Sequence, residues 1–169
     1  MRGGFFLDLA ATDGVSINNT VVMERDFGWS GIAIEPNAAY FAALRTNRAC
    51  QCIQACVDEF ARDVEFLANG ERGGIVANDT DNAPPIIDYF SFDVEGAETW
   101  VLRRFPFEKF TFLALTIERP TPEINATLFA NGYLFVRNCR MDTFYIHASA
   151  DTASTIERQP FAQLPAKSR

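Results

Sequence analysis

Carboxylate side chains recur at the ends of successive apolar segments of the chain. Asp8 lies inside the apolar run FFLDLA (residues 5–10), and Glu35 ends the run GIAIE (residues 31–35). The other acids that end or follow such runs are Asp58, Asp93, Glu95, Glu98 and Glu118. In open α/β sheets, ligands bind outside the carboxyl ends of the strands, where the strand order reverses. Acids at that edge form a negative crevice, which favours a cation or a hydroxyl-rich ligand and repels phosphate.

Short apolar runs alternate along the chain with amphipathic segments. The runs predict strands at residues 5–10, 31–35, 50–57, 86–93 and 110–118, with a further short strand at GIVA, residues 74–77. Helices are expected over residues 15–26, from Pro36-Asn37 onward, near residues 96–104, and after Thr121-Pro122. The runs GYLFVRNC and TFYIHA are close together and predict an antiparallel hairpin near residues 133–147.

This alternation predicts an α/β fold with a mainly parallel sheet covered on both faces. The terminal hairpin indicates a doubly wound domain with one reversed strand, and it argues against a closed barrel. A chain of 169 residues is most simply one domain, here residues 1–148. Residues 149–169 lose the periodic pattern and are expected to form a flexible tail.

Composition excludes several classes of partner. The net charge is −7 and no block of basic residues is present, so nucleic acid is not an expected partner. No apolar run approaches the roughly 20 residues that span a membrane. The four cysteines, with His147 as the only histidine, do not form a zinc-binding pattern. Buried free thiols are the better interpretation, and they favour a reducing, cytoplasmic compartment.

The turn after the first predicted strand reads Ala10-Ala11-Thr12-Asp13-Gly14. A dinucleotide-binding turn would carry G-x-G-x-x-G, and a Walker loop would carry glycines and a lysine. This turn keeps small residues but has one glycine and an extra acid, so it lacks phosphate-binding machinery. Glu35 stands where an acid commonly binds ribose hydroxyls. A ligand with a ribose, a positive charge and no pyrophosphate is S-adenosylmethionine.

Three segments resemble the FkbM-type family of S-adenosylmethionine-dependent methyltransferases: FFLDLAATDGVSINNT, GWSGIAIEPN and IDYFSFDVEGAETWVL. The similarity runs from about Phe5 to His147, and the pair GWSGIAIEPN and DVEGAE is its most specific part. The resemblance implies the class I methyltransferase fold, a Rossmann-like, seven-stranded sheet whose last strand is antiparallel. Ala10 departs from the family, which usually has glycine at this position.

The resemblance also implies roles for individual residues. The positions that match the family's cofactor-binding segments are Asp8, Ala10, Asp13, Gly14, Asn19, Glu35, Pro36, Asp58 and Asp93. Among them, Glu35 corresponds to the ribose-binding acid, and Asp58 to the residue near the adenine amine. Asp93 and Glu95 stand where the family's D-x-E-G segment flanks the site of methyl transfer.

The expected reaction is methyl transfer to a hydroxyl of a sugar or another small metabolite. The attacking hydroxyl must lose its proton, and Asp93, Glu95 or Glu118 could accept it. Alternatively, these oxygen ligands could hold a divalent cation such as Mg²⁺, which would lower the pKa of the acceptor hydroxyl. His147 closes the last predicted strand and is expected to be structural, although a role as a base stays open.

The chain begins four residues before the first predicted strand. Many class I methyltransferases have preceding helices that cover the cofactor. We therefore expect that a partner subunit, a second copy of the chain, or the loop from Asn69 to Pro85 covers the site, or that the site is open. The alternative is a catalytically inactive methyltransferase-like module that serves in binding or assembly.

Overall fold

The computed structural model describes residues 1–55, 83–94, 98–103 and 105–165. Its strands are β1 (Phe5–Leu9), β2 (Ser30–Ile34), β3 (Gln51–Ile53), β4 (Ile86–Phe92), β5 (Thr111–Glu118), β6 (Tyr133–Cys139) and β7 (Asp142–His147). Its helices are α1 (Val21–Phe27), α2 (Ala38–Asn47), α3 (Glu98–Arg103) and α4 (Pro122–Ala130).

The strands form a single seven-stranded sheet in the order β3-β2-β1-β4-β5-β7-β6. The five strands from β3 to β5 are parallel, and β7 is inserted antiparallel between β5 and β6. This arrangement confirms the prediction of a doubly wound, mainly parallel sheet with a reversed terminal strand. The chain order reverses between β1 and β4, so the carboxyl ends of these two strands mark the switch point.

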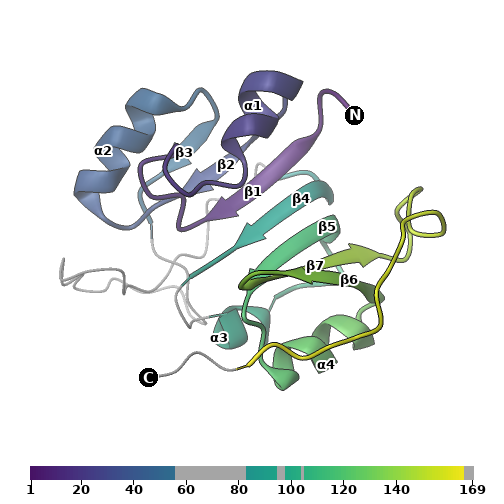
Figure 1. Cartoon of the computed structure of the whole chain (residues 1–169). Helices are drawn as coiled ribbons and strands as arrows, with labels where there is room; N and C mark the ends of the chain where they lie inside the picture. The colour runs from purple at the N-terminus through teal and green to yellow at the C-terminus, as the bar shows by residue number, and fades with distance from the viewer. Residues whose placement is uncertain (56–82, 95–97, 104, 166–169) are drawn as a thin grey trace.

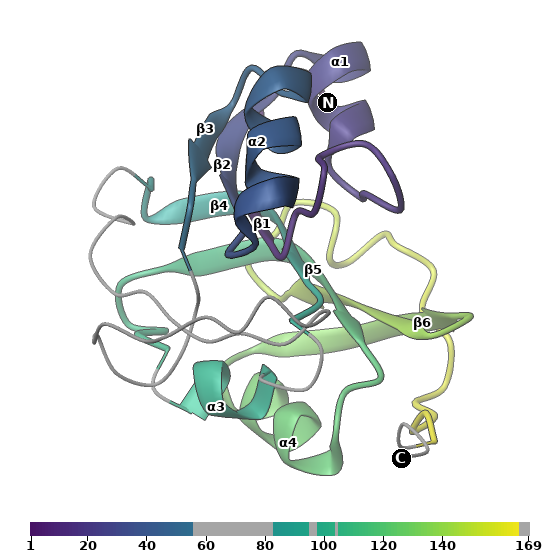
Figure 2. The same cartoon turned by 90° about the vertical axis from the view of Figure 1, so that its left-hand side faces the viewer.

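Helices cover the sheet from both sides. In Figures 1 and 2, α1 and α2 lie beside β1, β2 and β3 on one face, whereas α3 and α4 lie against the opposite face. On the α3/α4 face, a continuous apolar core joins the helices to the sheet; it includes Leu7, Ile32, Phe90, Leu115, Leu102, Ile124 and Leu128. On the other face, a smaller cluster of Ala11, Ala33 and Leu44 packs α2 on the sheet.

The strand register places polar residues in one row on the α1/α2 face. Asp8 is paired with Ser91 of β4, and Ser91 is paired with Thr116 of β5. Paired residues of neighbouring strands point to the same face, and successive residues alternate between faces. The apolar neighbours of this row, such as Leu7 and Phe90, therefore enter the core on the other side. This alternation explains how a carboxylate fits within a buried strand.

The structure differs from the sequence-based expectation at the first helix, which was predicted over residues 15–26. Helix α1 begins only at Val21, and residues 11–19 form an irregular turn. Asp13 and Asn18 bind nearby backbone N–H groups with their side chains, and this local bonding competes with helix formation. Strand β3 is shorter at its start than predicted. Residues 56–57 and the GIVA segment lie outside the described residues.

The segment after β7 packs on the domain over its described part. The Gln159 N–H donates to the Val136 carbonyl (2.8 Å), and Gln163 Nε2 donates to the Pro120 carbonyl (2.6 Å). The Phe161 ring lies edge-on to Phe129, with 5.4 Å between the ring centroids. The division at residue 148 and the flexibility of the tail stay predictions, but residues 149–165 have specific contacts.

A search of the helices in the described segments finds none with the length and apolar character needed to cross a lipid bilayer.

A substitution at Gly31 tests the packing of β2 against β1. A Cβ atom at this position would lie 2.5 Å from the backbone oxygen of Phe6, which cannot move aside. Gly31→Ala should therefore lower the free energy of unfolding by about 3 kcal/mol, the upper part of the usual range for overpacking. Denaturant titration measures this change.

Gly3→Ala is the matched control, because a Cβ atom there meets nothing within 4 Å and only the positive φ of 70° is unfavourable. A cost of about 1 kcal/mol is expected for it. Equal losses for the two variants would show that the close packing of β1 on β2 is wrong.

Candidate functional site

The turn between β1 and α1 has a strained backbone. Four of its residues have positive φ angles: Ala10 (60°), Thr12 (50°), Gly14 (76°) and Ile17 (48°). For residues other than glycine, this conformation costs about 1–2 kcal/mol. It persists where the surrounding structure over-determines it, and it is concentrated at functional sites. The contacts that hold this turn therefore define the site.

Most N–H groups of the turn are already bonded within the protein. The Gly14 N–H donates to the Ala11 carbonyl (2.9 Å). Asp13 Oδ1 accepts the N–H groups of Val15 (2.9 Å) and Ser16 (2.7 Å), and these bonds lower the pKa of the Asp13 carboxyl. A phosphate-binding turn instead points free N–H groups at its ligand. The geometry thus supports the sequence-based prediction that this turn lacks phosphate-binding machinery.

Glu35 directly follows β2 and holds the other side of the turn. Its Oε2 accepts the Thr12 N–H and its Oε1 accepts the Asn37 N–H, both at 2.8 Å. Burial raises the pKa of the Glu35 carboxyl, and the negative charge of Asp8 raises it further, although the two N–H bonds act in the opposite direction. Each carboxylate oxygen can accept a second bond. The backbone therefore orients Glu35 and leaves acceptor capacity for ligand hydroxyls.

Asp8 is buried at the carboxyl end of β1, with 3% of its surface exposed. Its Oδ2 accepts bonds from Thr20 Oγ1 (2.6 Å) and Asn18 Nδ2 (2.9 Å). Asn18 Oδ1 in turn accepts the Val21 N–H (2.9 Å) at the start of α1. Burial raises the pKa of the Asp8 carboxyl, against the opposing effect of its hydrogen bonds. Asp8 thus holds the turn through Thr20 and Asn18.

A buried guanidinium lies behind the same turn. Arg48, at the end of α2, has no exposed side-chain surface. Its Nη1 donates to the Gly14 carbonyl (3.2 Å) and to Asn18 Oδ1 (3.1 Å), its Nη2 donates to Thr20 Oγ1 (3.0 Å), and its Nε pairs with Glu24 Oε2 (3.2 Å). The sequence did not reveal this residue, because an arginine at a helix end is normally exposed. Its contacts depend on tertiary structure, and no spacing in the sequence indicates them.

The carboxyl edge of the sheet holds further carboxylates at β4, β5 and β7. Asp93 directly follows β4 and is half-buried. Glu118 ends β5, where it is paired with Asp142 of β7. Burial raises the pKa of the Asp142 carboxyl, and the charge of Glu118 raises it further. Arg119 follows Glu118 in the chain, with its Nε 3.8 Å from Glu118 Oε1.

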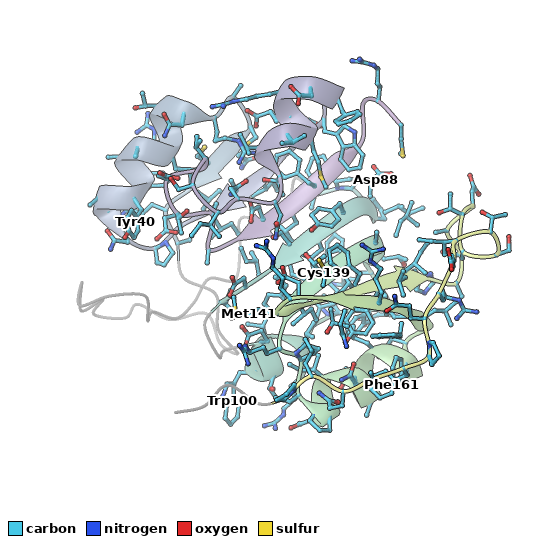
Figure 3. The ribbon with its side chains drawn as sticks, viewed as in Figure 1. Tyr40, Asp88, Trp100, Cys139, Met141 and Phe161 are labelled. Carbon is cyan, nitrogen blue, oxygen red and sulfur yellow. The ribbon has the colours of Figure 1, made fainter. Side chains whose placement is uncertain are left out.

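Asp142 was not among the predicted site residues. It begins the second strand of the hairpin, and the pairing of that strand with β5 brings it to the carboxyl edge. Figure 3 shows the edges clearly: Met141, at the hairpin tip, lies at this end of the sheet, and Asp88 of β4 lies toward the other end. Pairing the predicted hairpin with the predicted strand at residues 110–118 would have indicated that Asp142 lies at the carboxyl edge.

The remaining candidates are placed unevenly. Asn19 is exposed and donates to Ser91 Oγ (3.2 Å), and Pro36 is half-buried next to Glu35. Asp58 and Glu95 lie outside the described residues. Within the described ranges, no group of three His, Cys, Asp or Glu side chains could hold a metal ion. Since Glu95 is not described, a divalent cation at this edge stays a prediction.

His147 lies at the opposite edge of the sheet, where it is paired with Tyr133 at the start of β6. Its Nδ1 is 2.7 Å from Ser149 Oγ, and its Nε2 is 3.2 Å from the Asn131 carbonyl oxygen. This placement removes His147 from the candidate site and leaves the structural role that the sequence favoured.

Comparison with solved structures identifies the fold. The METTL16 methyltransferase domain is similar with a TM-score of 0.52 and 11% sequence identity, over 85% of this chain and 58% of that one. Other similar structures include a precorrin-6y C5,15-methyltransferase from Geobacter metallireducens (TM-score 0.48, 13% identity, 86% and 80% covered). An RNA methyltransferase from Salinibacter ruber in complex with S-adenosyl-L-homocysteine has a TM-score of 0.47 and 16% identity, with 96% and 87% covered.

The chain has the class I methyltransferase fold. The likeness to the METTL16 domain and the seven-stranded sheet order both support this statement. The chain spans 58% of that domain, and sequence identity at this level shows the fold alone. No protein-family model matches the sequence, and no curated protein is significantly similar to it. The resemblance to the FkbM-type family therefore stays a prediction.

Glu35→Ala tests the structural part of this site. From the sequence alone, loss of this side chain should not change stability without ligand. The structure leads us to expect otherwise, because the Thr12 and Asn37 N–H groups would lose their acceptors. We expect the free energy of unfolding to fall by about 1–3 kcal/mol, the usual cost of an unsatisfied buried group.

Thermal and denaturant unfolding without ligand measure this loss. Glu123→Ala is the control, because Glu123 is exposed on α4 and only pairs with Arg103 at the surface. If Glu35→Ala unfolds at the same denaturant concentration as Glu123→Ala, Glu35 does not hold the turn.

Proposed function

We propose that this protein is an S-adenosylmethionine-dependent methyltransferase that methylates a hydroxyl of a sugar or another small metabolite. The observation that carries the proposal is the position of Glu35. It lies beside the switch point of a class I methyltransferase fold, oriented by two backbone N–H groups, next to a turn whose own N–H groups are largely bonded. This combination suits a ribose without a pyrophosphate.

The chain's own residues suggest how the cofactor would be held. Glu35 would accept ribose hydroxyls, and the small residues Ala10 and Gly14 keep the turn compact. Asp58 is proposed to lie toward the adenine amine. Bound S-adenosylmethionine supplies a methyl group on a positively charged sulfur. The acidic edge around Asp8 and Glu35 complements this charge.

Removal of a proton is the second task of the site. A hydroxyl that attacks a methyl group loses its proton, and a carboxylate within reach accepts it. Asp93 and Glu118 are the described candidates, and Glu95 is the third. Glu118 is paired with Asp142, whose pKa is raised by burial and by the charge of Glu118. We assign Asp93 the role of principal base, because it follows β4 at the switch point.

Charge argues for a small acceptor. Proteins with one fold act on many substrates, so the fold does not select the acceptor. Binding of a phosphate backbone requires clustered lysine and arginine side chains. This chain has a net charge of −7 and a carboxyl edge that includes Asp93, Glu118 and Asp142. These features favour a neutral, hydroxyl-bearing small molecule over a nucleic acid.

Titration calorimetry with S-adenosylmethionine tests the proposal directly. Binding is expected, and NAD, which carries a pyrophosphate, serves as the control ligand that should not bind. Failure to bind S-adenosylmethionine would overturn the proposal. Binding without transfer of a labelled methyl group to any hydroxyl in a panel of sugars and phenols would instead favour the inactive binding module.

Asp93→Asn tests the catalytic assignment. The amide cannot accept the proton, so turnover should fall by about 10²-fold or more, the scale of general acid–base catalysis. Cofactor affinity should stay nearly unchanged, because Asp93 is proposed to face the acceptor. Single-turnover transfer of a labelled methyl group and calorimetry measure the two quantities.

Asp88→Asn is the matched control on the same strand. Asp88 lies toward the other end of the sheet, away from the carboxyl edge (Figure 3). Its Oδ2 accepts the Phe5 N–H at 2.8 Å. This variant should transfer methyl groups at the parent rate. Equal rates for Asp93→Asn and the parent would make Asp93 a structural residue.

A further inference from the structure

Arg48 carries a buried charge in a position that the reaction itself does not explain. Its side chain has no exposed surface, and it lies at the junction of α2 and β3, behind the turn that follows β1. A buried charge is strongly unfavourable unless it is paired and hydrogen-bonded. Its surroundings must therefore supply acceptors in fixed positions.

Those acceptors belong to the candidate cofactor turn and to α1. Nη1 donates to the Gly14 carbonyl and to Asn18 Oδ1, and Nη2 donates to Thr20 Oγ1, at 3.0–3.2 Å. Nε donates to Glu24 Oε2, which also accepts the N–H of Cys50 at the start of β3 (3.1 Å). One guanidinium thus joins the middle of the turn and its α1 end to Glu24 of α1, which in turn bonds the chain just before β3.

The same network reaches Asp8 through two short connections. Thr20 Oγ1 accepts a bond from Arg48 and donates to Asp8 Oδ2 (2.6 Å). Asn18 likewise accepts from Arg48 with its Oδ1 and donates from its Nδ2 to Asp8 (2.9 Å). The position of Arg48 therefore determines how the turn is attached to the end of β1.

Close packing adds a steric constraint. A Cβ atom on Gly14 would lie 2.6 Å from Arg48 Cγ and 2.6 Å from Leu44 Cδ1. The glycine of this turn therefore allows the backbone to rest directly on the Arg48 side chain. Gly14 also has a positive φ of 76°, and its carbonyl accepts a hydrogen bond from Arg48 Nη1.

We propose that Arg48 is a positioning residue that keeps the strained turn in the conformation the cofactor requires. It acts through Gly14, Asn18 and Thr20. A planar fork with several fixed donors is needed for this task, and lysine does not provide one. The link to cofactor affinity rests on the proposed function, whereas the link to the conformation of the turn does not.

Cofactor affinity is the first readout. Arg48→Met should weaken S-adenosylmethionine binding by about tenfold or more, because charge-assisted bonds hold the turn. Arg48→Lys restores the charge without the fork and should recover part of the affinity. Calorimetry is performed well below the unfolding temperature of each variant, so that loss of folded protein does not contribute.

Tyr133→Phe is the matched control. It removes a buried hydrogen bond, from the Phe112 N–H to the Tyr133 hydroxyl (3.1 Å), at the opposite edge of the sheet. It should lower the unfolding temperature and leave cofactor affinity unchanged. If the role of Arg48 were merely structural, Arg48→Lys would likewise lower the unfolding temperature and leave cofactor affinity unchanged. Parent-like affinity in Arg48→Lys would therefore overturn the proposal.

Hydrogen exchange is the second readout and needs no cofactor. In the parent, the Thr12 and Gly14 amides are bonded to Glu35 and to the Ala11 carbonyl. In Arg48→Lys, both should exchange about tenfold faster or more, while amides of β6 and β7 keep their protection. Unchanged exchange at Thr12 and Gly14 would overturn the role of Arg48 even in a protein that binds the cofactor. If the parent fails to bind S-adenosylmethionine, the proposed function falls, and this measurement still decides whether Arg48 positions the turn.

Discussion

Burial of the Arg48 charge is the constraint on which the carboxyl edge of the sheet depends. The guanidinium must find an acceptor for each group of donors, and it finds them at Gly14, Asn18, Thr20 and Glu24. These partners lie in the turn after β1 and in α1. The positive φ angles in the turn are unfavourable by themselves. The hydrogen bonds of Arg48, which is distant from the turn in sequence, offset this conformational cost.

The two faces of the sheet differ in the polarity of the side chains that they bury. The face under α3 and α4 is apolar, with stacked rings such as Phe90 and Phe92 (4.9 Å between centroids). On the other face, Asp8, Ser91 and Thr116 form a buried polar row, and the Tyr89 hydroxyl bonds to Thr116 (2.6 Å). Burial raises the pKa of Tyr89 to about 12, so its hydroxyl stays neutral at physiological pH.

Sequence patterns were sufficient for the sheet and insufficient for the turn. Buried parallel strands such as β1 and β4 are continuous apolar runs, and the hairpin after α4 has a clear signal, so the fold was predictable. Residues 15–20 were assigned to a helix, because their pattern does not show that Asn18 bonds Asp8 and Arg48. Arg48 and Asp142 were missed for a related reason: each acquires its place through contacts with residues far away in the chain.

The charges around Asp8 and Glu35 favour one kind of ligand over another. Burial raises the pKa values of Asp8 and Glu35, and the charge of Asp8 adds to the effect on Glu35. Both carboxylates are therefore held in an environment that disfavours negative charge. An anionic ligand would worsen this situation, and most N–H groups of the turn are bonded within the protein, to acceptors that include Asp13, Ala11 and Glu35. A cation near these carboxylates lowers their pKa values again. The positively charged sulfur of S-adenosylmethionine, the proposed cofactor, would interact favourably with such carboxylates.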